Sequence, residues 1–189
     1  MIYTDYLNNN KEARLFTNEF FVKGFKITLI KKPAFEIIGF TRFLYCSDGV
    51  SIGTFLKELT NSGQMSKLAG TLDISRQIWV CLSGNEGRPN SDCRCTVCVE
   101  KTNGHDFSQF KAEELFALKI PESEWADYEI GNGQSFMDLH KNDVYKMVQD
   151  IGYTFNDEVG LHFDNEHEEA RPNKGLHFLL PVKSKEGTR

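Results

Sequence analysis

The stretch that decides the fold is Ile27-Thr28-Leu29-Ile30-Lys31-Lys32-Pro33-Ala34-Phe35-Glu36-Ile37-Ile38-Gly39. Its β-branched and aromatic residues favour extended structure, and the same character continues over the wider range Phe25–Tyr45. Pro33 removes a backbone donor, and Gly39 suits a bulge or the close approach of another backbone. We therefore expect an edge-like strand, a kink at Pro33 and a continuing strand.

The other expected elements repeat one order along the chain. After the first strand, apolar spacing and turn residues predict a helix, two strands, an interrupted strand, a second helix and a final strand pair. In the first helix Ser51 can act as the cap and Gly63 ends or weakens the helix, and Gly152 is placed to cap the second. The ranges are Ser51–Leu68, Gln77–Ser83, Asp92–Lys101, Glu114–Ile130 (interrupted around Pro121), Ser135–Ile151, Leu161–Glu168 and Gly175–Lys183.

Strand, helix, strand, strand thus occurs twice, over residues 25–101 and 114–183, although the residues themselves are not similar. We predict an α+β fold of two βαββ modules, each an antiparallel sheet with a helix on one face. The uncovered faces would meet, and the crevice between the halves is a natural place for a ligand. The domain would span residues 25–184, after a polar lead-in (1–24) that can form one short helix and before a tail (185–189).

Composition argues against contact with nucleic acid or membrane. The 189 residues include 22 Lys and Arg against 27 Asp and Glu, a net charge of −5, and the basic residues form no stripe. No apolar run approaches the ~20 residues of a membrane span. The N-terminus lacks the features of a secretory signal. We expect a cytoplasmic protein whose five cysteines stay reduced.

The cysteine cluster Cys93-Arg94-Cys95-Thr96-Val97-Cys98 raises the question of a metal site. Structural zinc sites usually use two separated pairs of ligands. A strand places Cys93 and Cys95 on one face and Cys98 on the other. We therefore expect no bound metal. Because the sequence also lacks a dinucleotide-binding loop, P-loop, nucleophile elbow and metalloprotease motif, we expect no cofactor.

Aromatic residues recur in nearly every expected element. Converging on a crevice, they would bind a flat or cationic organic molecule by stacking and cation–π attraction. A carboxylate among them would complement a positive charge, and its pKa would be raised in an apolar pocket unless a cation paired with it. The candidate ligand-binding residues are Phe40, Phe55, Trp79, Trp125, Tyr128, His162, Asp164, Glu166 and His177.

Two interpretations of the histidines remain open. His162 and His177 can pair across strands, and with Asp164 or Glu166 they would resemble a carboxylate–histidine set. Alternatively, they are surface residues of an edge hairpin.

Four short segments resemble the gyrase-inhibitor-like (GyrI-like), or AraC-type, effector-binding domain family over residues 25–183. They are Ile27–Gly39, Ile78–Cys81, Ile120-Pro121 ahead of Trp125-Ala126, and Leu179–Val182. The resemblance implies a duplicated βαββ fold with a ligand pocket between the halves. Its multidrug-responsive members meet cationic aromatic ligands with a buried Glu. Matching that segment to Phe163-Asp164-Asn165-Glu166 puts Asp164 at the acid position and Glu166 at an aromatic one, and another register puts His162 at the acid position.

The resemblance also implies a function. Members fused to a helix-turn-helix act in transcription regulation, and because only 24 residues precede the expected domain we expect a stand-alone member. We expect it to sense or sequester a drug-like, hydrophobic or cationic aromatic molecule without being an enzyme. One alternative is a hydrolase of electrophilic or strained compounds, with Asp164 or Glu166 as acid–base and Tyr128 orienting the substrate. A second alternative is an inhibitor module that acts on a protein partner.

Overall fold

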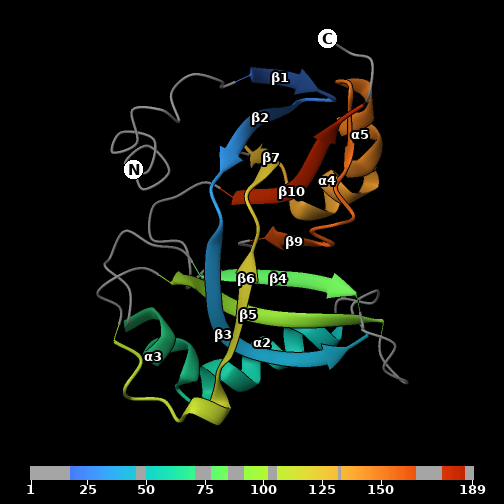
Figure 1. Cartoon of the computed structure of the whole chain (residues 1–189). Helices are drawn as coiled ribbons and strands as arrows, with labels where there is room; N and C mark the ends of the chain where they lie inside the picture. Colours follow the sequence, from blue (N-terminus) through green and yellow to red (C-terminus); the bar gives the residue numbers. More distant parts are fainter. Residues whose placement is uncertain are drawn as a thin grey trace. The chain divides into compact units, whose positions relative to one another are not determined.

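Figure 1 shows the computed structural model of the chain, which describes residues 18–45, 50–70, 78–84, 92–101, 106–131, 133–164 and 176–185. The chain divides into two compact units. The first comprises Met1–Ala34 and Pro121–Arg189, and the second comprises Phe35–Ile120. Both combine helices with strands that pair antiparallel, so the predicted α+β class is confirmed.

The strands of the first unit lie in the order β1–β2–β7–β10–β9, and β8 also pairs with β10. Helices α4 and α5 lie beside β10 and cover one face of this sheet (Figure 1). The bounds are β1 Asn18–Val22, β2 Phe25–Lys32, β7 Ser123–Ile130, α4 Phe136–Lys141, α5 Val144–Asp150, β8 Tyr153–Phe155, β9 Leu161–Asp164 and β10 Leu176–Ser184.

Alternation along these strands builds the core of the first unit. Side chains on a strand point to opposite faces in turn, so every second residue of β2, β7 and β10 faces the helices. Leu139 of α4 and Met147 of α5 pack against them, and both are fully buried. The strand residues of this core are Phe25, Ile27, Leu29, Ala126, Tyr128, Ile130, Phe178, Leu180 and Val182.

The strands of the second unit lie in the order β4–β5–β3–β6. Helix α2 lies alongside β3 and β5 (Figure 1), and Phe55 of α2 lies under Arg42 of β3, with 4.6 Å from the guanidinium carbon to the ring centroid. A single 3-10 turn precedes β6. The bounds are β3 Phe35–Leu44, α2 Val50–Asn61, α3 Gln64–Gly70, β4 Trp79–Gly84, β5 Cys93–Lys101, the 3-10 turn Ala112–Glu114 and β6 Phe116–Ile120.

The predicted kink at Pro33 is confirmed, and it separates the two units. Strand β2 ends at Lys32 and pairs with β7, whereas β3 begins at Phe35 and pairs with β5 and β6. The interruption at Pro121 works in the same way, because β6 belongs to the second unit and β7 to the first. The compact units therefore differ from the consecutive ranges 25–101 and 114–183, since each long strand is divided at its proline.

Both predicted helices are broken in two. Gly63, with φ 74°, separates α2 from α3, as its position suggested. The range Ser135–Ile151 is interrupted before Asp143, which has φ 57° and accepts a hydrogen bond from the Lys146 amide to start α5. Apolar spacing continues across this break, so the sequence predicts one helix where there are two. Gly152, with φ 88°, follows α5 as expected of a helix end.

The last part of the expected lead-in, residues 1–24, contains a strand that the sequence did not predict. Asn18–Val22 forms β1 and pairs with β2, with Phe20 opposite Ile27. Phe20 and Val22 pack against the core, which stabilises this edge strand. Residues 1–17, where the short helix was expected, lie outside the described residues.

The prediction that all cysteines stay reduced is also wrong, because Cys93 is disulfide-bonded. That expectation rested on the absence of an export signal, which carries no information on distances between thiols. Cys81, Cys95 and Cys98 are buried. The predicted faces are confirmed. Cys95 pairs with Arg42 and Cys98 pairs with Gly39, and these two β3 residues are an odd number of positions apart, so their side chains lie on opposite faces. Within the described residues no group of His, Cys, Asp and Glu is arranged to hold a metal ion.

None of the described helices combines the length and the apolar character that a membrane-crossing helix requires.

The close approach expected at Gly39 leads to a stability prediction. A Cβ there would lie 2.0 Å from the Val97 carbonyl oxygen and 2.6 Å from the Cys98 Cα, so an added methyl group must separate β3 from β5. We expect Gly39→Ala to lower the free energy of unfolding by at least about 2 kcal/mol. Urea denaturation measures the change.

Gly53→Ala is the matched control. Nothing lies within 4 Å of a Cβ at this position in α2, and alanine favours a helix, so we expect a gain of about 0.5–1 kcal/mol. Equal unfolding midpoints for the two variants would contradict the proposed packing of β3 on β5.

Candidate functional site

The sheet of the first unit has a second face, opposite to α4 and α5, and its register arranges the side chains there in rows across β2, β7 and β10. Side chains directly opposite one another on paired strands lie on the same face. The rows are Lys26, Glu129 and His177, then Thr28, Asp127 and Leu179, and then Ile30, Trp125 and Pro181. This face therefore changes from charged to apolar along the strands, and we call it the helix-free face.

Exposure changes in the same direction. Trp125 is fully buried, the side chain of Asp127 is 8% exposed, and the side chain of His177 is 22% exposed. Glu129, in the charged row, is half exposed. Asp127 thus lies at the border between an apolar floor and a solvated rim, where a carboxylate is costly unless it is paired.

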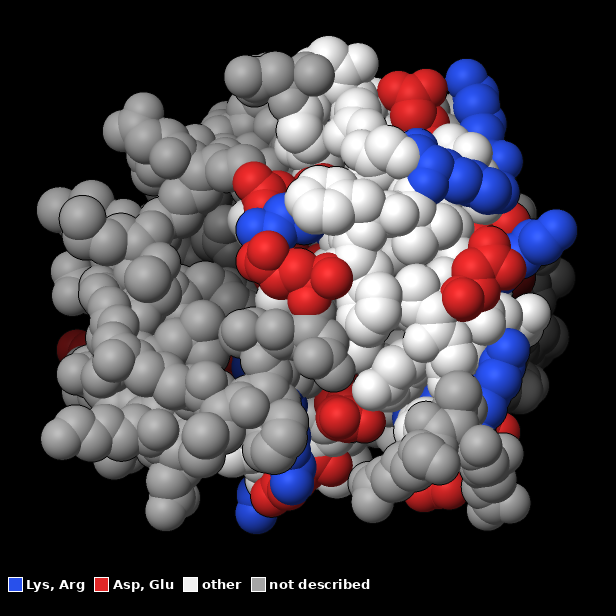
Figure 2. Space-filling view, turned by 90° about the horizontal axis from the view of Figure 1, so that it is seen from above, with Lys and Arg blue, Asp and Glu red and all other residues white. Residues whose placement is uncertain are grey.

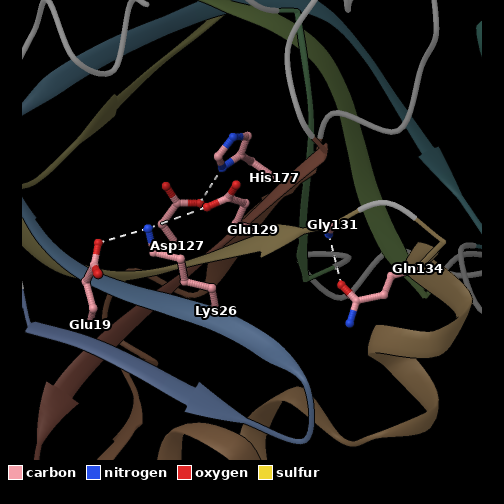
Figure 3. A network of polar contacts seen from close by, with 7 residues as sticks. All are labelled: Glu19, Lys26, Asp127, Glu129, Gly131, Gln134 and His177. Carbon is pink, nitrogen blue, oxygen red and sulfur yellow. Dashed lines mark hydrogen bonds and ion pairs between the residues drawn. The ribbon is translucent and has the colours of Figure 1, made fainter.

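Asp127 is paired with His177. Its Oδ1 lies 2.8 Å from His177 Nδ1, across one diagonal of the β7–β10 ladder (Figure 3). Burial lowers the pKa of His177, but the hydrogen bond and charge of Asp127, with the charge of Glu129, outweigh it, so the net pKa lies above its ordinary value of 6.5. Asp127 is thus a carboxylate whose partner, a histidine, holds its proton to a higher pH than an ordinary histidine does.

A second set of charges lies beside this pair in Figure 3. Lys26 Nζ lies 2.9 Å from a Glu19 carboxylate oxygen and 3.7 Å from one of Glu129. The hydrogen bond to Glu19 is the main cause that raises the pKa of Lys26. Carboxylates from β1 and β7 therefore outnumber the ammonium of β2, which favours an additional cation at this rim.

The apolar floor is partly aromatic. The rings of Trp125 and Phe163 lie 5.6 Å apart between centroids, and Phe163 pairs with Leu179 of the Asp127 row. At the rim, Phe21 of β1 pairs with Lys26 and is 75% exposed. Aromatic faces at both ends of a carboxylate can hold an organic cation by cation–π attraction.

Two of the residues proposed from sequence, Trp125 and His177, share this helix-free face. Tyr128 does not, because it points toward the helices and its hydroxyl donates to the Val144 carbonyl at 2.8 Å. Burial strongly raises the pKa of this hydroxyl, and the charge of Asp143 adds to the effect. Tyr128 is thus placed in the core.

Of the two open interpretations of the histidines, a cross-strand pair of His162 with His177 does not fit the strand register. Asp164 pairs with Phe178, and the His162 ring lies 5.1 Å from the Phe178 ring, so His162 and Asp164 share the Phe178 face. His177 precedes Phe178 and points to the opposite face, where Asp127 meets it. Glu166 lies outside the described residues.

The remaining candidates belong to the second unit. Trp79 pairs with Cys98, on the sheet face away from the helices. Phe55 lies on the helix side, under Arg42, and Phe40 shares that side of β3 and packs edge-on against Phe110 at 5.7 Å between ring centroids. Of these three aromatic residues, only Trp79 therefore lies on a helix-free face.

Sequence reasoning missed Asp127, Glu129 and Lys26. A signal for Asp127 was present, because Asp is disfavoured within strands and this one follows Trp125-Ala126 directly. Its partner lies 50 residues further along the chain, and only the register of β7 with β10 brings the two together.

Charges of both signs are interspersed over the described residues of the face shown in Figure 2. This agrees with the net charge of −5 and provides no continuous basic surface on the described part of that face.

Comparison of the sequence with protein-family models finds no match, and comparison with curated proteins finds none. Solved structures do match. SAV2435 bound to tetraphenylphosphonium aligns with 83% of this chain and 93% of its own, at a TM-score of 0.59 and 11% identity. The C-terminal domain of EcmrR aligns with 85% of this chain and 98% of its own, at a TM-score of 0.50 and 12% identity.

A structure of EcmrR in a complex with DNA also matches. It covers 97% of this chain, which in turn covers 64% of the EcmrR chain, at a TM-score of 0.52 and 17% identity. At these identities the matches show a shared fold. The fold is thus shared with a protein that was solved with a small molecule, SAV2435, and with EcmrR, which was solved with DNA.

The Asp127–His177 pair predicts a pH dependence. Because the pKa of His177 is raised, the pair stabilises the folded protein fully below pH 6.5, and this contribution is lost as the pH rises through the raised pKa. Proton NMR should show His177 titrating with a midpoint above 6.5. In Asp127→Asn the midpoint should fall below 6.5, because the burial remains. An unchanged midpoint would contradict the pairing.

Tyr128→Phe tests the placement of Tyr128. It removes a buried hydroxyl and leaves the Val144 carbonyl without this donor, so we expect the free energy of unfolding to fall by about 1–2 kcal/mol. The His177 titration should be unaffected, because the two side chains lie on opposite faces. A shifted His177 midpoint in this variant would argue against that separation.

Proposed function

We propose that this chain is a GyrI-like effector-binding domain that binds an organic cation with aromatic groups on the helix-free face of its first unit. The observation that carries the proposal is Asp127, a nearly buried carboxylate between the Trp125 floor and the charged rim. The cation would lie against Asp127, and its aromatic groups would extend toward Trp125 and Phe163.

Physical chemistry favours a cation at this position. A carboxylate in an apolar setting is stabilised by a positive charge close to it, and a low local dielectric strengthens that attraction. A delocalised organic cation is weakly hydrated, so it loses little on leaving water for an aromatic surface. The shared fold with SAV2435, which was solved with tetraphenylphosphonium, supports this ligand class.

The biological role that follows is sensing or sequestering such compounds. EcmrR, whose C-terminal domain shares this fold, also occurs in a complex with DNA, which supports the proposed relation to effector domains of regulators. We propose that the chain acts through its ligand rather than by touching DNA itself, in line with its net charge of −5.

Tetraphenylphosphonium is the direct probe of this proposal. We expect saturable binding by calorimetry, and we expect Asp127→Asn to weaken it about tenfold or more, because the buried counter-charge is lost. Asp157→Asn is the matched control, since Asp157 is an exposed partner of Lys183 at the end of β8. Equal losses in both variants would point to general electrostatics rather than to a site.

Phe21→Ala tests the rim. Its side chain is 75% exposed, so removal should leave the unfolding midpoint unchanged and weaken tetraphenylphosphonium binding about two- to fivefold. Unchanged affinity would exclude Phe21 from the site and limit the contacts to the floor.

The Asp127–His177 pair also supports the hydrolase alternative, because a histidine oriented by a carboxylate is a common general base. Turnover separates the two functions. A hydrolase would consume an electrophilic substrate and lose this activity in His177→Asn while still binding, whereas a binding protein returns its ligand unchanged.

A further inference from the structure

The Asp127 carboxylate already has a cationic partner when His177 is protonated. We propose that an organic cation bound at Asp127 displaces the proton of His177, so that the site exchanges one positive charge for another. This inference rests on the proposed function and adds to it how the affinity is regulated.

Geometry is the first argument. His177 Nδ1 lies 2.8 Å from Asp127 Oδ1, so an imidazolium there and an organic cation at the same carboxylate would be close like charges. Like charges at such separation repel strongly where water is partly excluded. Asp127 is 6% exposed and offers little solvent to screen them.

The surrounding charges leave His177 as the group that responds. From β7 it faces Asp127 and Glu129, from β2 it faces Lys26, and Lys26 is held in turn by Glu19 of β1. From β9 the described residues on this face are the neutral Leu161 and Phe163, because Asp164 lies on the other face. Lys26 stays protonated at neutral pH because its pKa is raised from an already high value.

The proton balance is simple. The imidazolium carries a hydrogen on each ring nitrogen, and it releases one proton to the buffer when the organic cation binds. The neutral ring keeps its Nδ1 hydrogen and continues to donate to Asp127, so the exchange needs no rearrangement of the strands. The total charge of the site is the same before and after.

Linkage then sets the pH dependence. Below the pKa of His177, each bound cation releases about one proton, and the affinity rises about tenfold per pH unit. Above that pKa no proton is released and the affinity is constant. The site therefore binds cations most tightly above the pKa of His177 and loses them as the pH falls below it.

Calorimetry of tetraphenylphosphonium binding to the full chain tests this inference, because the probe is positively charged at every pH. Titrations from about pH 5.5 to about pH 8.5, in phosphate and in Tris, give the affinity and, from the difference in heat, the protons released. We expect about one proton released at low pH and none at high pH. Neutral triphenylphosphine oxide should release none.

His177→Asn should bind tetraphenylphosphonium with the high-pH affinity of the wild type at every pH and release no proton. His162→Asn is the matched control and should keep both the pH dependence and the proton release, because His162 lies on the opposite face. If His177→Asn does not fold, two measurements on the wild type test the exchange instead. They are the number of protons released on binding and the NMR titration of His177 with and without tetraphenylphosphonium.

Binding without pH dependence or proton release would overturn the exchange and leave the proposed function standing. Proton release that persists in His177→Asn would also overturn it, by assigning the proton to another group. Absence of tetraphenylphosphonium binding at every pH would overturn both the exchange and the proposed function.

Discussion

Strand β7 pairs with β2 on one side and with β10 on the other, and this double pairing constrains every side chain of the first unit. Because consecutive residues point to opposite faces, Tyr128 must enter the helix core when Asp127 leaves it. A shift of one residue in register would bury Asp127 under α4 and α5 and expose Tyr128. The apolar core and the polar site are therefore fixed by the same ladder, and neither can move independently.

Burial of the Asp127 carboxylate lowers the stability of the fold. The Asp127 carboxylate lies at the edge of an apolar floor and is paired with His177. A buried ion pair often offsets only part of the hydration that its charges lose. A well-packed apolar residue in place of Asp127 would be expected to stabilise the fold as well or better. A charge at this position therefore calls for a reason other than stability, and the proposed recognition of a cation is such a reason.

The sequence predicts what depends on local chemistry. Pro33 and Pro121 interrupt strands by removing backbone donors, so both breaks were foreseeable, as was the close approach at Gly39. The break before Asp143 was not, because the apolar spacing continues across it. The resemblance directed attention to Asp164, whereas the buried carboxylate on the helix-free face is Asp127. Nothing local distinguishes the two, because the choice of face depends on pairing between β7, β9 and β10.

The type of residue that pairs with Asp127 matters more for ligand binding than the fact that it can be positively charged. A lysine at position 177 would stay protonated across the physiological range and would compete with an organic cation at every pH. The carboxylate would then be paired, but it would not be accessible to a ligand cation. An asparagine would leave the Asp127 carboxylate without a positive partner, which would lower the stability of the protein without ligand. Histidine lies between these, because it partly neutralises Asp127 when it is protonated, and in the proposed exchange it gives up its charge when a cation binds. The pair therefore suits a site that must be stable without ligand and still accept one.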